Sequence, residues 1–146
     1  MAEAFGETQK TILLVEDHSA LLKLVRQILE DANFSVIPAK NAREAMRLEA
    51  EFPGTINLLL SDVRMRGMSG PDLALRLLER RPQIRVVLMS GYPVGASVVH
   101  HNGWHYIQKP FLPAALVDRI RIALRGETRS APSRMAAGQA SSGWNG

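Results

Sequence analysis

Short apolar runs alternate with amphipathic stretches along most of the chain, and this alternation constrains the fold more strongly than any other feature. Continuous apolar runs are typical of strands covered on both faces, and the stretches between them place leucine, isoleucine and valine at helical spacing. Strands that alternate with helices form a parallel sheet with right-handed crossovers. We predict five strands, at 12–15, 36–37, 56–60, 86–89 and 104–107.

Capping residues and prolines indicate where the intervening helices begin. The residues that mark these starts are Ser19, the pair Asn41 and Glu44, Pro71 and Pro113. Gly126 suits the end of the last helix. Between 94 and 101 we expect a fourth helix that is short or irregular, because Gly95 interrupts it.

The predicted fold class is therefore a three-layer α/β sandwich with about five helices. Five strands in this length fit a parallel sheet of the flavodoxin-like order 2-1-3-4-5. We expect residues 11–126 to form one domain, because residues 1–10 and 127–146 lack a periodic apolar face. We interpret residues 1–10 as a flexible N-terminus. Residues 127–146 are rich in glycine, serine and alanine, and we interpret them as a flexible tail or linker.

Composition excludes several classes of protein. The 146 residues contain no cysteine, which rules out disulfides, thiol catalysis and thiolate metal sites. No apolar stretch approaches the roughly 18 residues of a membrane span, and the N-terminus lacks the apolar core of a secretory signal. We therefore expect a cytoplasmic domain that does not contact membranes directly.

Polar side chains follow the predicted strands at the sheet edge where ligands bind in open α/β folds. They are Glu16 and Asp17 after the first strand, Asp62 after the third, Ser90 after the fourth and Lys109 after the fifth. Clustered carboxylates repel one another and favour a hard cation such as Mg²⁺. Together with a lysine and a hydroxyl, this set suits a phosphoryl group, and one of the carboxylates could act as the nucleophile.

The same residues lie in four segments with a family likeness: ILLVEDH, LLLSDVRMRGMSGPDL, VVLMSGY and YIQKPF. In this order and spacing they resemble the receiver domain of bacterial two-component response regulators, over roughly residues 10–126. The resemblance implies that Asp62 is a phosphoacceptor, supplied by a sensor histidine kinase or a histidine phosphotransfer protein. It implies that Ser90 and Lys109 contact the phosphoryl oxygens, and that Tyr106 reorients as Ser90 moves. It also implies a Mg²⁺ site formed by Glu16, Asp17, Asp62 and the backbone carbonyl of Arg64.

This resemblance describes a signalling phosphoacceptor, not a turnover enzyme, although such domains promote their own phosphotransfer and dephosphorylation. The short segment between Ser90 and Lys109 looks most like receivers attached to hybrid sensor histidine kinases, in which case the parent chain would be a histidine kinase. A free-standing receiver and a homodimer both stay open. Arg64 and Arg66 replace the family's smaller residue and its proline. We therefore expect Arg64 to change the lifetime of the aspartyl phosphate.

Two competing enzymatic or cofactor-binding functions each lack a required feature. A phosphatase of the haloacid-dehalogenase type needs an acid two residues after the nucleophile, where Arg64 stands, and a flavin-binding module needs a phosphate loop in place of Glu16 and Asp17. A pseudo-receiver that binds proteins without phosphorylation stays an alternative.

The net charge of +4 raises the question of nucleic acid. No aromatic side chain accompanies the arginine cluster at 76–85, and no helix-turn-helix pattern follows residue 126. We therefore expect no direct nucleic-acid binding, and we interpret the cluster as a solvated face or a docking patch for an acidic partner.

Overall fold

The computed structural model describes residues 9–91 and 103–126, and these form a five-stranded parallel sheet with helices on both faces. The strand order is β2-β1-β3-β4-β5, which confirms the predicted architecture. The elements are β1 (Thr11–Val15), α1 (Ser19–Asp31), β2 (Ser35–Ala39), α2 (Ala42–Glu51), β3 (Leu58–Asp62), α3 (Gly70–Arg80), β4 (Arg85–Ser90), β5 (His105–Gln108) and α5 (Pro113–Leu124). The predicted fourth helix at 94–101 and the tail at 127–146 lie outside the described residues, as does most of the N-terminal segment.

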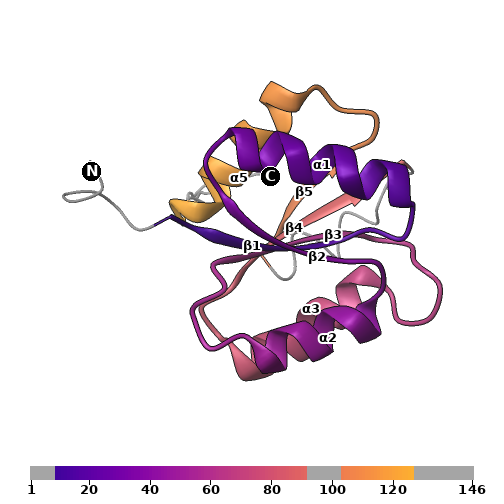
Figure 1. Ribbon diagram of the computed structural model, residues 1–146, viewed down its shortest axis with the longest axis vertical. Helices are drawn as coiled ribbons and strands as arrows, with labels where there is room; N and C mark the ends of the chain where they lie inside the picture. Colours follow the sequence, from indigo (N-terminus) through magenta and orange to yellow (C-terminus); the bar gives the residue numbers. More distant parts are fainter. Residues whose placement is uncertain (1–8, 92–102, 127–146) are drawn as a thin grey trace, which may run out of the picture.

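Two apolar layers hold the helices against the sheet. Figure 1 shows α1 and α5 on one face and α2 and α3 on the other. Alternate residues of β1 point to opposite layers, with Ile12 and Leu14 toward α1 and α5 and Leu13 and Val15 toward α2 and α3. This placement explains the continuous apolar run of β1, because both faces of a central parallel strand are buried.

Two strands are displaced from their predicted ranges, and the other three extend beyond theirs. β3 begins at Leu58 instead of at residue 56, because Asn57 exchanges hydrogen bonds with Thr11 across the start of the sheet: its Oδ1 and its backbone N–H both pair with the Thr11 backbone, at 2.8 and 2.9 Å. β5 is displaced by one residue, to His105–Gln108. β2 extends through Pro38, which a strand at the sheet edge tolerates.

The helix starts follow the predicted caps with one exception. Asn41 Oδ1 accepts a 2.7 Å hydrogen bond from the Glu44 backbone N–H at the start of α2, as expected. The prediction that Ser19 caps α1 is wrong. His18 has the extended backbone of a cap residue, and its Nδ1 accepts a 3.3 Å hydrogen bond from the Leu21 N–H.

Gly126 takes a positive φ of 76° one residue beyond Arg125, the C-cap of α5, as the glycine at that position predicted. None of the helices in the described residues is long and apolar enough to cross a membrane.

Candidate functional site

The carboxyl ends of β1, β3 and β5 bring Glu16, Asp62 and Lys109 together, although 93 residues separate the first and the last. The Lys109 ammonium lies 2.9 Å from Glu16 Oε1 and 3.1 Å from Asp62 Oδ1. Glu16 is almost fully buried, and its second oxygen, Oε2, accepts a 3.0 Å hydrogen bond from the His18 backbone N–H. Glu16 is therefore fixed at both oxygens, and it orients Lys109 beside Asp62.

Asp17 completes a cluster of three carboxylates. Glu16, Asp17 and Asp62 each place one oxygen within 4.8 Å of the others. Asp17 is exposed, whereas Asp62 is nearly buried. An all-oxygen set with one solvent-facing member suits a hard divalent cation that keeps part of its water shell, as Mg²⁺ does.

The environment of the site raises the pKa of both Asp62 and Lys109. A raised pKa disfavours the charged form of Asp62 and favours the charged form of Lys109. Burial raises the pKa of Asp62, the neighbouring carboxylate of Glu16 raises it further, and Lys109 offsets only part of this effect. Burial alone would lower the pKa of Lys109, but its contacts with Glu16 and Asp62 outweigh burial and raise that pKa. The site therefore favours a charged ammonium and carries more negative charge than Lys109 neutralises.

Ser90 lies on β4, the strand next to β3, and Tyr106 lies on β5, the strand beyond β4. Ser90 is the last residue of β4, one position beyond the Met89 that is paired with Asp62, and it is buried. Its backbone carbonyl accepts hydrogen bonds from the Lys109 N–H at 2.8 Å and from the Tyr106 hydroxyl at 3.5 Å. A cis peptide bond joins Lys109 to Pro110.

Arg64 and Arg66 both lie exposed in the loop that follows β3. Arg66 and Asp17 line the same groove.

Gly70 is a positioning residue that the sequence reasoning missed. A Cβ atom on Gly70 would lie 2.2 Å from the backbone oxygen of Asp62 and 3.1 Å from Ser61 Oγ. The hydroxyl of Ser61 donates a 2.9 Å hydrogen bond to the same Asp62 oxygen. The start of α3 is therefore packed directly on the backbone that presents the Asp62 side chain, and only glycine permits that approach.

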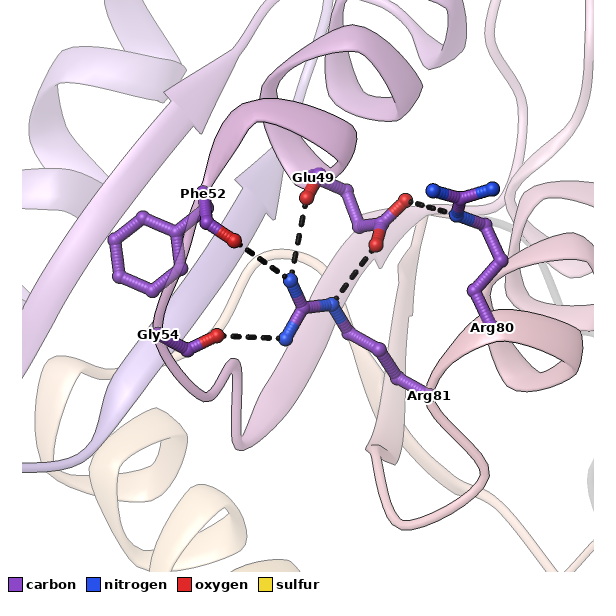
Figure 2. Close-up of polar contacts among 5 residues, drawn as sticks. All are labelled: Glu49, Phe52, Gly54, Arg80 and Arg81. Carbon is purple, nitrogen blue, oxygen red and sulfur yellow. Dashed lines mark hydrogen bonds and ion pairs between the residues drawn. The ribbon is translucent and has the colours of Figure 1, made fainter.

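A second polar cluster is formed by Glu49, Arg80 and Arg81 (Figure 2). It corrects the interpretation of the arginine cluster as a solvated face or docking patch for Arg80 and Arg81, whereas Arg76 and Arg85 are exposed. The Glu49 carboxylate is buried and accepts hydrogen bonds from Arg80 Nε at 2.7 Å and Arg81 Nε at 2.9 Å. Arg81 also donates to the backbone carbonyls of Gly54, Glu49 and Phe52. Arg81 thus joins the end of α2 to the end of α3.

A sequence signal for this cluster did exist. Glu49 lies on the same helical stripe as the buried Ala42 and Ala45. A glutamate on an apolar stripe needs a cationic partner, since an unpaired buried carboxylate is strongly unfavourable.

Residues 12–121 match the family of response regulator receiver domains. The chain belongs to this family. It is 34% identical over 117 residues to the C4-dicarboxylate transport transcriptional regulatory protein DctD of Rhizobium meliloti, covering 77% of this chain and 25% of that protein. It is 34% identical over 114 residues to the sensor kinase CckA of Brucella abortus, covering 76% of this chain and 12% of that protein.

A solved structure of similar fold is the CheY-like response regulator receiver domain protein from Methanospirillum hungatei. That chain is 29% identical, with a TM-score of 0.74, and the match covers 82% of this receiver and 96% of that chain. These similarities confirm the predicted family and fold, and they do not favour the phosphatase or flavin-binding alternatives. The receiver spans only about a quarter or less of the length of the two relatives named above.

Proposed function

We propose that Asp62 accepts a phosphoryl group from the phosphohistidine of a sensor histidine kinase or a histidine phosphotransfer protein. The observation that carries this proposal is Lys109, which lies within 3.1 Å of Asp62 and within 2.9 Å of Glu16 at the end of the sheet. In the transfer, an Asp62 oxygen attacks phosphorus. The new O–P bond forms as the P–N bond breaks, and the electron pair of that bond remains on the donor histidine.

The residues around Asp62 divide the remaining work. Lys109 keeps its positive charge and stabilises the ionised form of Asp62 and then the phosphoryl oxygens. Ser90 supplies a hydroxyl at the end of the adjacent strand. Tyr106 contacts the Ser90 backbone, so a movement of Ser90 toward the phosphoryl group would change the position of the tyrosine ring.

A Mg²⁺ ion would be held by Glu16, Asp17, Asp62 and the backbone carbonyl of Arg64. When bound, it would neutralise the repulsion among the carboxylates and the incoming phosphoryl oxygens. The clustered oxygens support this assignment, because such a set is typical of a hard cation and lacks the histidine or cysteine ligands of softer metals.

Phosphorylation of the full chain by a small donor tests the proposal without knowledge of the kinase. Incubation with phosphoramidate and Mg²⁺ should add one phosphoryl group, seen by intact-mass measurement, and Asp62→Asn should receive none. Asp118→Asn changes an exposed carboxylate on α5 and should behave as the native protein. Failure of the native protein to accept phosphate from this donor and from histidine kinases would contradict the proposal and favour a pseudo-receiver.

The setting of the domain follows from the same reasoning. We infer a signalling phosphoacceptor that acts in the cytoplasm, where a kinase would meet it. Its relatives include both transcriptional regulators and a sensor kinase. The short segment before Lys109 favours the second setting, a receiver joined to or paired with a hybrid kinase, without direct contact with nucleic acid.

A further inference from the structure

A groove of about 660 Å³ opens beside the acidic cluster, between the start of α2 and the loop that joins β3 to α3. Its lining combines one carboxylate with three basic and several apolar or small side chains. The residues are Asp17, Lys40, Asn41, Ala42, Arg43, Met46, Arg66, Gly67 and Met68. The loop that joins β2 to α2 and the loop that joins β3 to α3 both leave the carboxyl ends of their strands (Figure 1). Asp62 is the last residue of β3.

Among the residues that the structure describes, the three basic side chains of the groove have no acidic partner. Lys40, Arg43 and Arg66 are all exposed. Within residues 9–91 and 103–126, the side chain of none of the three forms an ion pair or a hydrogen bond; the Lys40 backbone N–H donates to Glu44 Oε1. The contrast with Arg47 is informative, because that arginine on the same helix pairs with both Glu44 and Glu51. The groove therefore presents an excess of positive charge that the fold does not use.

We propose that this groove docks an acidic segment of the protein that exchanges the phosphoryl group with Asp62. The three cations would pair with glutamate or aspartate side chains of the segment, which gives charge complementarity across the contact. Met46 and Met68 would cover an apolar side chain of the segment, since methionine adapts to varied shapes. This inference rests on the proposed function only for the identity of the partner, because the groove itself needs no phosphate.

The form of the groove favours a protein segment over a small anion. Small-molecule sites usually enclose most of the ligand surface and aim a few buried polar groups at it. Here the three cations are exposed. Exposed charges of this kind contribute chiefly to the encounter of two large charged surfaces and to the choice of partner.

The position of Asp17 links the groove to phosphotransfer. Asp17 belongs both to the groove lining and to the carboxylate cluster around Asp62. Its negative charge opposes an acidic segment, so a cation that neutralises Asp17 would strengthen docking. A partner held in the groove would therefore be recruited to the form of the site that is ready for phosphotransfer.

The test uses a labelled probe peptide in which glutamates flank a central leucine. Its binding to the full chain is followed by fluorescence anisotropy at low ionic strength, and the contact is mapped by amide chemical shifts. We expect the shifts to concentrate in residues 40–46 and 66–68. The double variant Arg43→Glu/Arg66→Glu should weaken binding by roughly tenfold or more, the effect of two exposed charge pairs replaced by repulsion.

A matched control changes the net charge equally away from the groove. Lys10 and Lys23 are exposed and lie outside the groove, so Lys10→Glu/Lys23→Glu should lower the affinity by less than about twofold at moderate salt. Equal losses in both double variants, shifts elsewhere on the surface, or no binding by the native protein would each overturn the proposal. Equally strong binding of pyrophosphate, with displacement of the peptide, would also overturn it and identify a small-anion site.

Phosphorylation separates this inference from the proposed function. The Arg43→Glu/Arg66→Glu variant should still accept phosphate from phosphoramidate, because it retains Asp62 and Lys109. Loss of that reaction would place the groove residues in the phosphoryl site and overturn the docking proposal. Peptide binding to a native protein that accepts no phosphate would instead contradict the proposed function and leave the groove as an acidic-segment site.

Discussion

Replacing Arg81 by methionine should destabilise the domain far more than the same change at Arg80, although the two arginines are adjacent and bind the same carboxylate. Arg81 has a side chain that is 20% exposed, whereas that of Arg80 is 60% exposed. Only Arg81 also donates to three backbone carbonyls at and beyond the end of α2. Methionine preserves most of the side-chain length, so the comparison isolates the guanidinium group.

The magnitude follows from what each variant leaves unpaired. Removing one partner of a buried ion pair costs about 3–5 kcal/mol, because the remaining charge stays out of water. In Arg81→Met the Glu49 carboxylate keeps its 2.7 Å contact with Arg80, so we expect a loss near the lower limit, about 3 kcal/mol. In Arg80→Met the buried contacts of Arg81 persist, and the expected loss is about 1 kcal/mol, as for an exposed pair.

Urea unfolding followed by circular dichroism measures both losses. In thermal unfolding of a domain of this size, the Arg81→Met change should lower Tm by roughly 10 °C. The double variant Glu49→Gln/Arg81→Met provides the decisive comparison. Because a neutral amide replaces the stranded carboxylate, its loss should be smaller than the sum of the two single losses. Additive losses, or equal effects of Arg80→Met and Arg81→Met, would refute the assignment of Arg81 as the main partner of Glu49.

Three further outcomes are expected around the acidic cluster. The pKa of Asp62 is raised in the folded protein, so its ionisation disfavours folding. Asp62→Asn should therefore increase the free energy of unfolding at neutral pH, and urea titrations should show that gain shrinking as the pH falls toward the ordinary carboxyl value of 3.8. Gly70→Ala should cost about 1–3 kcal/mol by overpacking against the Asp62 carbonyl and should slow phosphorylation by phosphoramidate, as seen by intact mass. Arg64→Ala should change the rate at which the phosphorylated protein loses its phosphate, measured by the same method, and an unchanged rate would exclude a role for that guanidinium.

The fold was largely predictable because most of the sequence features that specify it act locally. The apolar run that precedes Glu16 and the capping pair Asn41 and Glu44 act within a few residues of the chain. The two failures depended on a partner residue, one adjacent in the chain and one distant. Ser19 looked like a cap by residue type, yet the ring nitrogen of His18 takes that position. The start of β3 was misplaced because Asn57 is held by Thr11, a long-range contact that no pattern within the strand reveals.

The site divides in the same way. The residue types at the strand ends predicted which side chains would meet, because parallel strands place their carboxyl ends on one edge. They did not predict that Gly70 would pack on the Asp62 carbonyl, since a glycine in a loop next to Pro71 looks like an ordinary turn residue. Nor did spacing reveal that Arg81 is occupied by Glu49, because the two belong to different helices and their pairing depends on how α2 and α3 pack.

The Glu49 cluster and the carboxylate cluster at the sheet edge differ in how far their charges are compensated. Glu49 has two arginine partners, and the remaining donors of Arg81 are satisfied by backbone carbonyls, so the charge of the Glu49 carboxylate is compensated within the fold. At the sheet edge, three carboxylates share one lysine. That imbalance lowers the stability of the domain, and a cation bound there would relieve it in the folded state alone. Cation binding should consequently stabilise the domain by about 1.4 kcal/mol at ten times its Kd. The uncompensated charge is therefore the physical reason that this edge, and not the Glu49 cluster, is able to respond to a ligand.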